Sequence, residues 1–347
     1  MVEVLSIGLG GVGVIAAHAL ETSNENVHVT AVIRSDFDKV ISEGYTIKQM
    51  AVGESAQREP SLEGYTPTHV VKSLEDAVAL GPFDYIVVST KAIPQTSNNV
   101  WDQVYELREK LIKTEDITSI VLIQNGLDIE KQWSKLGKSV NMISGVSYIS
   151  SINTKGTINM WAPDAVTFGL FDPAAGNHSK LSQFIQLYTH SINSVEEDKN
   201  VRFTRMRKLL YNASFNTICC LTNSDVAVVF ATDGVIDNIV RPLMKEIQLV
   251  ANQDLKLHGS EQLLEDSHVE GMIKFTEETD VPFNYEPSML VDLRNKRQIE
   301  LQVILANLIQ VYKQNNPEVD VKVSIPYINF LYYSLKVVQH KLAHGIA

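Results

Sequence analysis

The chain opens with VEVLSIGLGGVGVIAAHAL (residues 2–20), in which a glycine-rich segment separates two apolar runs. The run before the glycines is typical of a buried strand, and the run after them is typical of a helix. The segment itself, Gly8-Leu9-Gly10-Gly11-Val12-Gly13, matches the G-x-G-x-x-G pattern in its strand, turn and helix context. Gly8 permits the tight turn, Gly10 lets the backbone approach a pyrophosphate, and Gly13 lets the helix pack closely on the strand. The stretch therefore predicts a dinucleotide site at a helix N-terminus.

The second expected strand, residues 27–33, bears on the choice of dinucleotide because it ends at Arg34. Domains that bind NAD place an acidic residue near this point for the ribose 2′-hydroxyl, whereas an arginine suits the 2′-phosphate of NADP. Arg34 thus predicts NADP as the cofactor. Asp36, two residues later, is the competing group, since it would take the hydroxyl if the loop turned differently.

Two further strands, residues 84–90 and 119–123, are followed by Lys91 and Asn125. Strands that alternate with helices indicate a doubly wound parallel sheet of the Rossmann type, whose ligands lie at the carboxyl ends of the strands. Taken alone, Lys91 is typical of a solvated loop and Asn125-Gly126 of a turn. Taken with the glycine loop and Arg34, they favour a cofactor site along one edge of the sheet.

A charged segment, residues 196–200, separates this pattern from a long helical one. We therefore expect an α/β fold with a dinucleotide-binding domain over residues 1–199 and a second, all-α domain over residues 200–347. A chain of 347 residues is long enough for two such domains.

The first helix of the second domain, residues 202–216, carries Lys208, Asn212 and Asn216 at spacings of four residues. This spacing places the three side chains on one face, beside apolar positions. Asparagine is a mediocre helix former and is seldom buried without partners, so the row is a candidate polar site. A hydrated polar stripe is the alternative.

Further along, Pro287-Ser288 has the character of a helix start, and Glu300 stands at the head of a long apolar helix. An acidic residue in a first helical turn is favourable for dipole reasons alone, so position does not by itself give Glu300 a role.

The composition excludes several kinds of partner. The formal charge of −11 makes nucleic acid and anionic membrane surfaces unfavourable partners. No apolar run reaches the length of a membrane span, and a first strand at residue 2 leaves no room for a signal peptide, so we expect a cytoplasmic protein. The two cysteines, Cys219 and Cys220, are adjacent, and we expect both in the core of a protein from a reducing compartment. No clustered His, Cys or carboxylate spacing suggests a metal site.

These motifs, in this order, resemble those of the ketopantoate reductase family: the glycine fingerprint, Lys91, Gln124-Asn125-Gly126, Lys208-x-x-x-Asn212-x-x-x-Asn216, and Pro287-Ser288-Met289-x-x-Asp292 followed by Glu300. The resemblance runs from residue 1 to about residue 335. It implies NADPH-dependent reduction of 2-dehydropantoate (ketopantoate) to pantoate on the route to pantothenate. It further implies that Lys208 is the catalytic acid and that Glu300 is a catalytic or substrate-orienting carboxylate. Asn212, Asn216 and Ser288 would hold the substrate, and Lys91 and Asn125 would line the nicotinamide side.

The chain also departs from the family pattern. Members usually carry a glycine a few residues after the glutamate, where this chain has Leu305-Ala306-Asn307, and the tract between Arg34 and Lys91 is long. Relatives of this family reduce other 2-oxo acids, including the mandelate pair, so a different 2-oxo acid or ketone is the first alternative. A non-catalytic NADP-binding sensor is the second. Long apolar helices in the second domain make a homodimer plausible.

Overall fold

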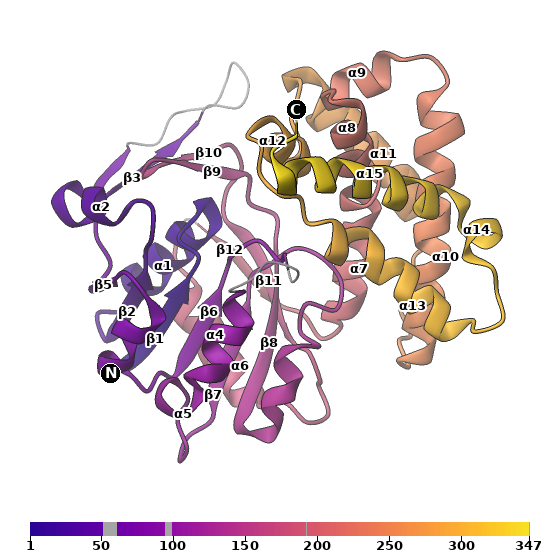
Figure 1. The fold of residues 1–347 in the computed structure, drawn as a ribbon. Helices are drawn as coiled ribbons and strands as arrows, with labels where there is room; N and C mark the ends of the chain where they lie inside the picture. The colour runs from indigo at the N-terminus through magenta and orange to yellow at the C-terminus, as the bar shows by residue number, and fades with distance from the viewer. Residues whose placement is uncertain (51–60, 94–98, 192, 347) are drawn as a thin grey trace. The chain divides into compact units, whose positions relative to one another are not determined.

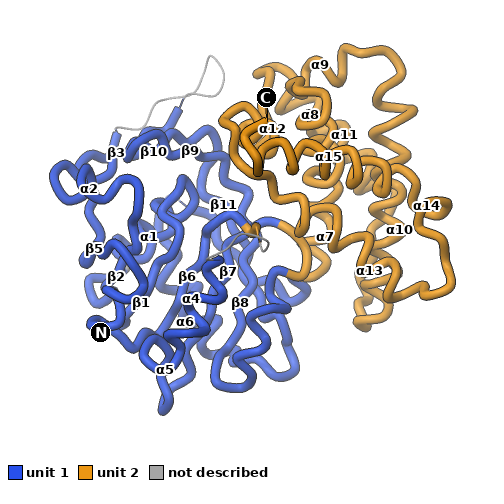
Figure 2. The backbone as a smooth tube through the Cα atoms, in the orientation of Figure 1, with its two compact units in different colours: residues 1–91, 96–125, 129–201 blue, residues 92–95, 126–128, 202–347 orange. Residues whose placement is uncertain are grey.

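The computed structural model describes residues 1–50, 61–93, 99–191 and 193–346. The chain divides into two compact units, which Figure 2 shows in different colours. Unit 1 comprises residues 1–91, 96–125 and 129–201, and unit 2 comprises residues 92–95, 126–128 and 202–347. Two short segments that follow strands of unit 1 therefore belong to unit 2.

The centre of unit 1 is an eight-stranded sheet in the order β12-β11-β8-β7-β6-β1-β2-β5 (Figure 1). The strands are β1 (Val2–Ile7), β2 (Val27–Val32), β5 (His69–Val71), β6 (Tyr85–Val88), β7 (Thr118–Leu122), β8 (Val140–Ser147), β11 (Ala165–Leu170) and β12 (Ser194–Glu197). The run from β8 to β5 is parallel, and this confirms the Rossmann-type fold. At one edge the sheet is mixed, because β11 pairs antiparallel with β8. The chain between β8 and β11 makes no helical crossover there, and a parallel return requires one.

Both faces of this sheet are buried, as a doubly wound fold requires. Tyr85 and Val87 of β6 belong to a core that includes side chains of α1 (Gly11–Ser23) and α6 (His178–Tyr188). Ile86 and Val88 alternate with them along the strand, so they point to the opposite face, and they too are fully buried. The remaining helices of unit 1 are α2 (Phe37–Glu43), α3 (Leu74–Ala77), α4 (Val100–Glu106) and α5 (Arg108–Leu111), with 3-10 turns at Val78–Leu80 and Trp133–Ser139.

A second, four-stranded sheet in unit 1 has the order β4-β3-β10-β9. Its strands are β3 (Tyr45–Gln49), β4 (Leu62–Tyr65), β9 (Ser151–Thr154) and β10 (Thr157–Met160). β3 pairs parallel with β10, although more than a hundred residues separate them. The buried side chains of Tyr45 and Ile158 join this sheet to the core that contains α1.

Unit 2 is built of helices, as predicted. They are α7 (Val201–Asn212), α8 (Phe215–Thr222), α9 (Val226–Ala231), α10 (Arg241–Leu257), α11 (Asp266–Thr279), α12 (Ser288–Arg294), α13 (Asn307–Asn315), α14 (Val321–Ser324) and α15 (Pro326–His344). π-Helical turns at Ile236–Val240 and Gln302–Ala306 precede α10 and α13, and a 3-10 turn covers Val281–Phe283. Cys219 and Cys220 are buried and free. Among the described residues, no helix combines the length and the apolar character needed to cross a bilayer.

Candidate active site

The glycine loop of unit 1, residues 8–13, is tightly packed at Gly8 and Gly13 and has open space at Gly10. Gly8 has φ of +101°, and a Cβ there would lie 2.6 Å from the backbone nitrogen of Thr90. A Cβ at Gly13 would collide with the carbonyl oxygen of Gly8 and the hydroxyl of Ser89. At Gly10, the residue that precedes α1, a Cβ would meet nothing within 4 Å. Open space at bare helix amides fits a pyrophosphate, and the crowding at Gly8 and Gly13 explains why glycine is required.

The other predicted cofactor residues lie along the same edge of the sheet as this loop. Arg34 follows β2, Lys91 follows β6 and Asn125 follows β7. Since β7, β6, β1 and β2 are parallel neighbours, their carboxyl ends share one edge. Arg34 is exposed and makes no hydrogen bond or ion pair within the part of the chain that the structure describes.

Two residues of β9 that were not predicted from the sequence also lie against the glycine loop. A Cβ on Gly11 would come within 2.7 Å of the backbone oxygen of Ser151. Asn153 donates a hydrogen bond to the backbone oxygen of Leu9 (3.1 Å). No sequence motif marks either residue as a neighbour of the glycine loop, because β9 is placed there by its pairing in the second sheet.

In unit 2, Lys208 and Glu300 lie close enough for the charge of one to act on the other. Lys208 is half-buried on α7, and Glu300 is buried just before the π-helical turn at Gln302–Ala306. The pKa of Lys208 is lowered to about 8, first by burial and then by the charge of Arg205, while the charge of Glu300 opposes the change. Glu300 Oε1 accepts a hydrogen bond from the backbone N–H of Ala92 (2.9 Å), which fixes one carboxylate oxygen.

Arg205 is a further residue of this site that sequence reasoning missed. It is buried on α7, one turn before Lys208, and its guanidinium donates to the backbone oxygen of Gly126 (3.1 Å). The only sequence signal is its spacing of three residues from Lys208, and a basic helix offers many such spacings. Its contact with Gly126 holds a positive charge near the lysine, where it favours the neutral amine.

The π-helical turn explains how the chain accommodates Leu305-Ala306-Asn307 in place of the expected glycine. Gly126 has φ of +102°, and a Cβ there would lie 2.5 Å from the Cβ of Val303. The Val303 carbonyl accepts the N–H of Leu127 (2.8 Å), and Asn307 Nδ2 donates to the Leu127 oxygen (2.7 Å). The loop at Gly126 and the π-helical turn at Val303 can therefore approach closely, because the glycine stands in the loop rather than in the helix.

Asn307→Ala is expected to lower the free energy of unfolding by about 1–2 kcal/mol, because the buried carbonyl of Leu127 would lose its donor. Chemical denaturation of the purified chain measures this change. Asn295→Ala is the matched control, since among the described residues the exposed side chain of Asn295, directly after α12, donates only to the Val291 oxygen (2.7 Å), and a change below about 0.5 kcal/mol is expected there. Equal losses in both variants would show that Asn307 does not fasten the loop.

The polar row predicted on one helix is divided between two. α7 ends at Asn212 and α8 begins at Phe215, with Ser214 at φ −114° and ψ −81° between them. The row nevertheless stays together, because Asn216 Nδ2 donates to Asn212 Oδ1 (3.2 Å) and both side chains are buried. Asn216 Oδ1 also accepts the N–H of Met289 (3.3 Å), which ties the row to the start of α12, where Ser288 is exposed.

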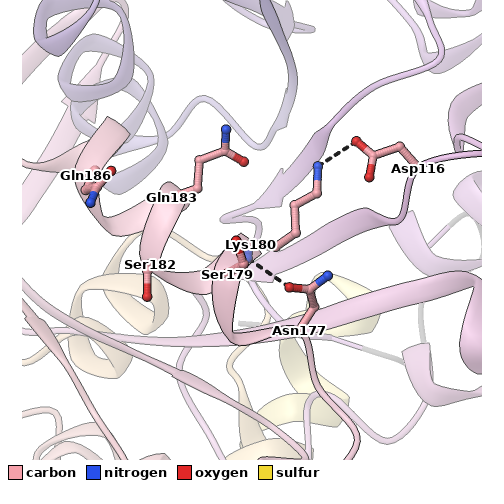
Figure 3. A pocket seen from close by; sticks show the side chains of 7 residues that line it. All are labelled: Asp116, Asn177, Ser179, Lys180, Ser182, Gln183 and Gln186. Atoms are coloured by element: carbon pink, nitrogen blue, oxygen red, sulfur yellow. Dashed lines mark hydrogen bonds and ion pairs between the residues drawn. The ribbon is translucent and has the colours of Figure 1, made fainter.

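A polar hollow in unit 1 lies elsewhere (Figure 3). It is lined by Asp116, Asn177, Ser179, Lys180, Ser182, Gln183 and Gln186. Asp116 precedes β7, so the hollow stands at the amino ends of the parallel strands, opposite the glycine loop. Its lysine pairs with Asp116 (2.8 Å), and this hydrogen bond lowers the pKa of the carboxyl group. The hollow therefore offers no free cation and is separate from the cofactor edge. Within the described ranges, no three His, Cys, Asp or Glu residues are grouped as a metal site.

A Rossmann-type unit with a glycine-rich first turn, followed by a helical unit, is the architecture of a two-domain dinucleotide-binding protein. The chain belongs to the ketopantoate reductase family. The model described as "Ketopantoate reductase PanE/ApbA" matches residues 4–173, and the one described as "Ketopantoate reductase PanE/ApbA C terminal" matches residues 200–339.

Three similar proteins cover nearly the whole chain. An uncharacterized protein of Saccharomyces cerevisiae is 35% identical, and the match covers 99% of this chain and 95% of that protein. The crystal structure of 2-dehydropantoate 2-reductase from Geobacter metallireducens has a TM-score of 0.80 at 20% identity and covers 97% of this chain and 99% of its own. D-mandelate dehydrogenase with NADH and anilino(oxo)acetate has a TM-score of 0.73 at 16% identity and covers 99% of both chains. At these identities, the two solved structures show a shared fold.

Proposed function

We propose that the protein is an NADPH-dependent reductase of a 2-oxo acid, and that its substrate is 2-dehydropantoate, which it converts to pantoate for pantothenate biosynthesis. The observation that carries the proposal is the half-buried amine of Lys208, whose pKa of about 8 lies near neutral pH and which has Glu300 within electrostatic reach. An amine with this pKa suits a general acid, because it is protonated at neutral pH and gives up the proton readily. Membership of the family supports the choice of substrate.

The residues of this chain would then act as follows. NADPH, when bound, would supply the hydride for reduction of the substrate carbonyl. Negative charge builds on the carbonyl oxygen, and Lys208 Nζ stabilises that charge and delivers the proton that completes the hydroxyl group. Glu300 favours the protonated lysine until that transfer, and its hydrogen bond from Ala92 keeps the carboxylate in place.

The remaining residues serve in binding. Gly8, Leu9, Gly10, Gly11, Val12 and Gly13 would hold the pyrophosphate, Arg34 the 2′-phosphate, and Lys91 and Asn125 the nicotinamide side. Asn212, Asn216 and Ser288, with Asn125, would hold the small polar acid without adding net charge. The buried amides of Asn212 and Asn216 support this assignment, since they keep polar groups in an apolar setting.

Another 2-oxo acid is the second candidate substrate. D-mandelate dehydrogenase shares the fold, so a wider pocket for an aromatic acid would need no change in architecture. A non-catalytic sensor is disfavoured, because such a protein has no need of a lysine whose pKa is lowered beside a carboxylate.

Asn212→Ala is expected to raise the KM for the 2-oxo acid about tenfold and to leave the Kd of NADPH within about twofold, because the amide would contact the substrate and not the cofactor. Steady-state kinetics and calorimetric titration measure the two quantities. The control is Asn295→Ala, which removes an exposed asparagine directly after α12. A lowered Tm with unchanged KM in Asn212→Ala would give Asn212 a structural role instead.

The proposal also includes a homodimer and a cytoplasmic location. α15 exposes Phe330, Tyr333 and Val337 at helical spacing, which supports a second copy as a partner for that helix. Free Cys219 and Cys220 support a reducing compartment.

A further inference from the structure

The side chain of Asn153 joins the glycine loop to the segment that follows β2. Its Nδ2 group donates to the backbone oxygen of Leu9 (3.1 Å) and to Asp36 Oδ2 (2.8 Å), and its Oδ1 accepts the N–H of Gly156 (2.9 Å). Both amide hydrogens are therefore used, one on the glycine loop and one on the segment that follows β2.

The amide can satisfy these three partners in only one orientation. If it were reversed, its oxygen would face the carbonyl of Leu9 and the carboxylate of Asp36, which are both acceptors. Asp36 is thus held as an acceptor for Asn153. Its charge also reaches the buried hydroxyl of Tyr45, since burial and then Asp36 raise the pKa of that group. The Asp36 carboxylate therefore faces the second sheet, to which Asn153 and Tyr45 both belong.

Arg34 contrasts with Asp36, because it is exposed and makes no hydrogen bond or ion pair to any described residue. A carboxylate that was free at this point would accept the ribose 2′-hydroxyl of NADH and repel the 2′-phosphate of NADPH. We propose that Asn153 is a specificity-determining residue, which holds Asp36 away from the adenosine ribose and so leaves Arg34 to select the 2′-phosphate. This inference rests on the proposed function for its choice of NADPH.

The test compares the Kd values of NADPH and NADH for the intact chain, measured by calorimetric titration without substrate. Asn153→Leu keeps a similar volume and donates no hydrogen bond. The preference for NADPH over NADH is expected to fall about tenfold, because the released Asp36 can serve the 2′-hydroxyl. Loosening of the glycine loop affects both cofactors alike and cancels in the ratio. Asn153→Ala provides the same test if the leucine does not pack.

Two controls isolate Asp36. Asp36→Ala alone is expected to leave the Kd of NADH within about twofold, and Asp36→Ala added to Asn153→Leu is expected to restore the preference for NADPH. Asn141→Leu is the matched loss of a bridging asparagine, since Asn141 donates to Ser119 Oγ (3.1 Å) and accepts the N–H of Asn177 (2.8 Å) at the amino end of the sheet. Asn141→Leu should leave the ratio of the Kd values of NADPH and NADH unchanged.

An unchanged ratio in both Asn153 variants would overturn the inference, as would a tenfold loss of NADH affinity in Asp36→Ala alone. Such results in a protein that still prefers NADPH leave the proposed function intact. A wild-type protein that binds NADPH no more tightly than NADH would contradict the proposed cofactor and this inference with it.

Discussion

Lys208→Ala is expected to lower kcat for the 2-oxo acid by about 10²-fold or more, the usual scale for loss of a positioned general acid. The Kd of NADPH should change by less than about twofold, because the glycine loop and Arg34 belong to unit 1 and Lys208 to unit 2. Steady-state kinetics and calorimetric titration of the same preparation separate the two effects.

The pH dependence of kcat identifies the role of the lysine more directly. Its pKa is about 8, so the amine is protonated below that value and loses its proton as the pH rises through it. Reduction should therefore slow above about pH 8 in the wild-type protein, well below the ordinary lysine value of 10.5. The pH profile of kcat for Lys208→Ala should lack this decrease above about pH 8. A lysine that only attracted the substrate by its charge would change KM and would not cause such a decrease in kcat.

Lys208→Arg is the matched control, because it retains the positive charge but donates a proton poorly. It should restore substrate affinity better than it restores kcat. Wild-type turnover in both variants would refute the assignment and favour a sensor over an enzyme.

Arg34→Ala is expected to weaken NADPH binding by a factor of about ten to one hundred, the value of a charge-assisted hydrogen bond to a phosphate. The Kd of NADH should stay within about twofold, since NADH presents a hydroxyl group at that position. Calorimetric titration of both cofactors measures the difference.

Lys72→Ala controls for the loss of one positive charge in the same unit. Lys72 is exposed and stands directly after β5, the neighbour of β2 in the sheet. If Lys72→Ala reproduces the loss, or if Arg34→Ala weakens both cofactors equally, Arg34 does not select the 2′-phosphate.

The fold could be predicted from the sequence where local patterns decide it. The strand, glycine turn and helix of residues 2–20 form one continuous unit, and their periodicity gives β1 and α1 directly. The second sheet could not be predicted, because β3 finds its partner β10 far along the chain and neither strand has a strong pattern of its own. The antiparallel pairing of β11 could not be predicted either, since the alternation of apolar and polar residues along a strand does not give the direction of the strand.

The site divides in the same way. Lys208, Asn212 and Asn216 could be found from their spacing, although a break at Ser214 interrupts the helix that the spacing implied. Glu300 was set apart by the family resemblance rather than by its position. Arg205 and Asn153 were missed because each is placed by a bond to a backbone carbonyl, of Gly126 and Leu9 respectively, and any residue supplies such a carbonyl.

Reduction of 2-dehydropantoate by NADPH is tested by mixing the wild-type protein with both compounds and identifying the product. We expect NADPH to be consumed and pantoate to accumulate in equal amounts, with a higher kcat/KM than for the 2-oxo acid of the mandelate pair or for NADH as the reductant. Consumption of NADPH with the aromatic acid but not with 2-dehydropantoate would contradict the proposed substrate, and no consumption with any 2-oxo acid would contradict the proposed reaction.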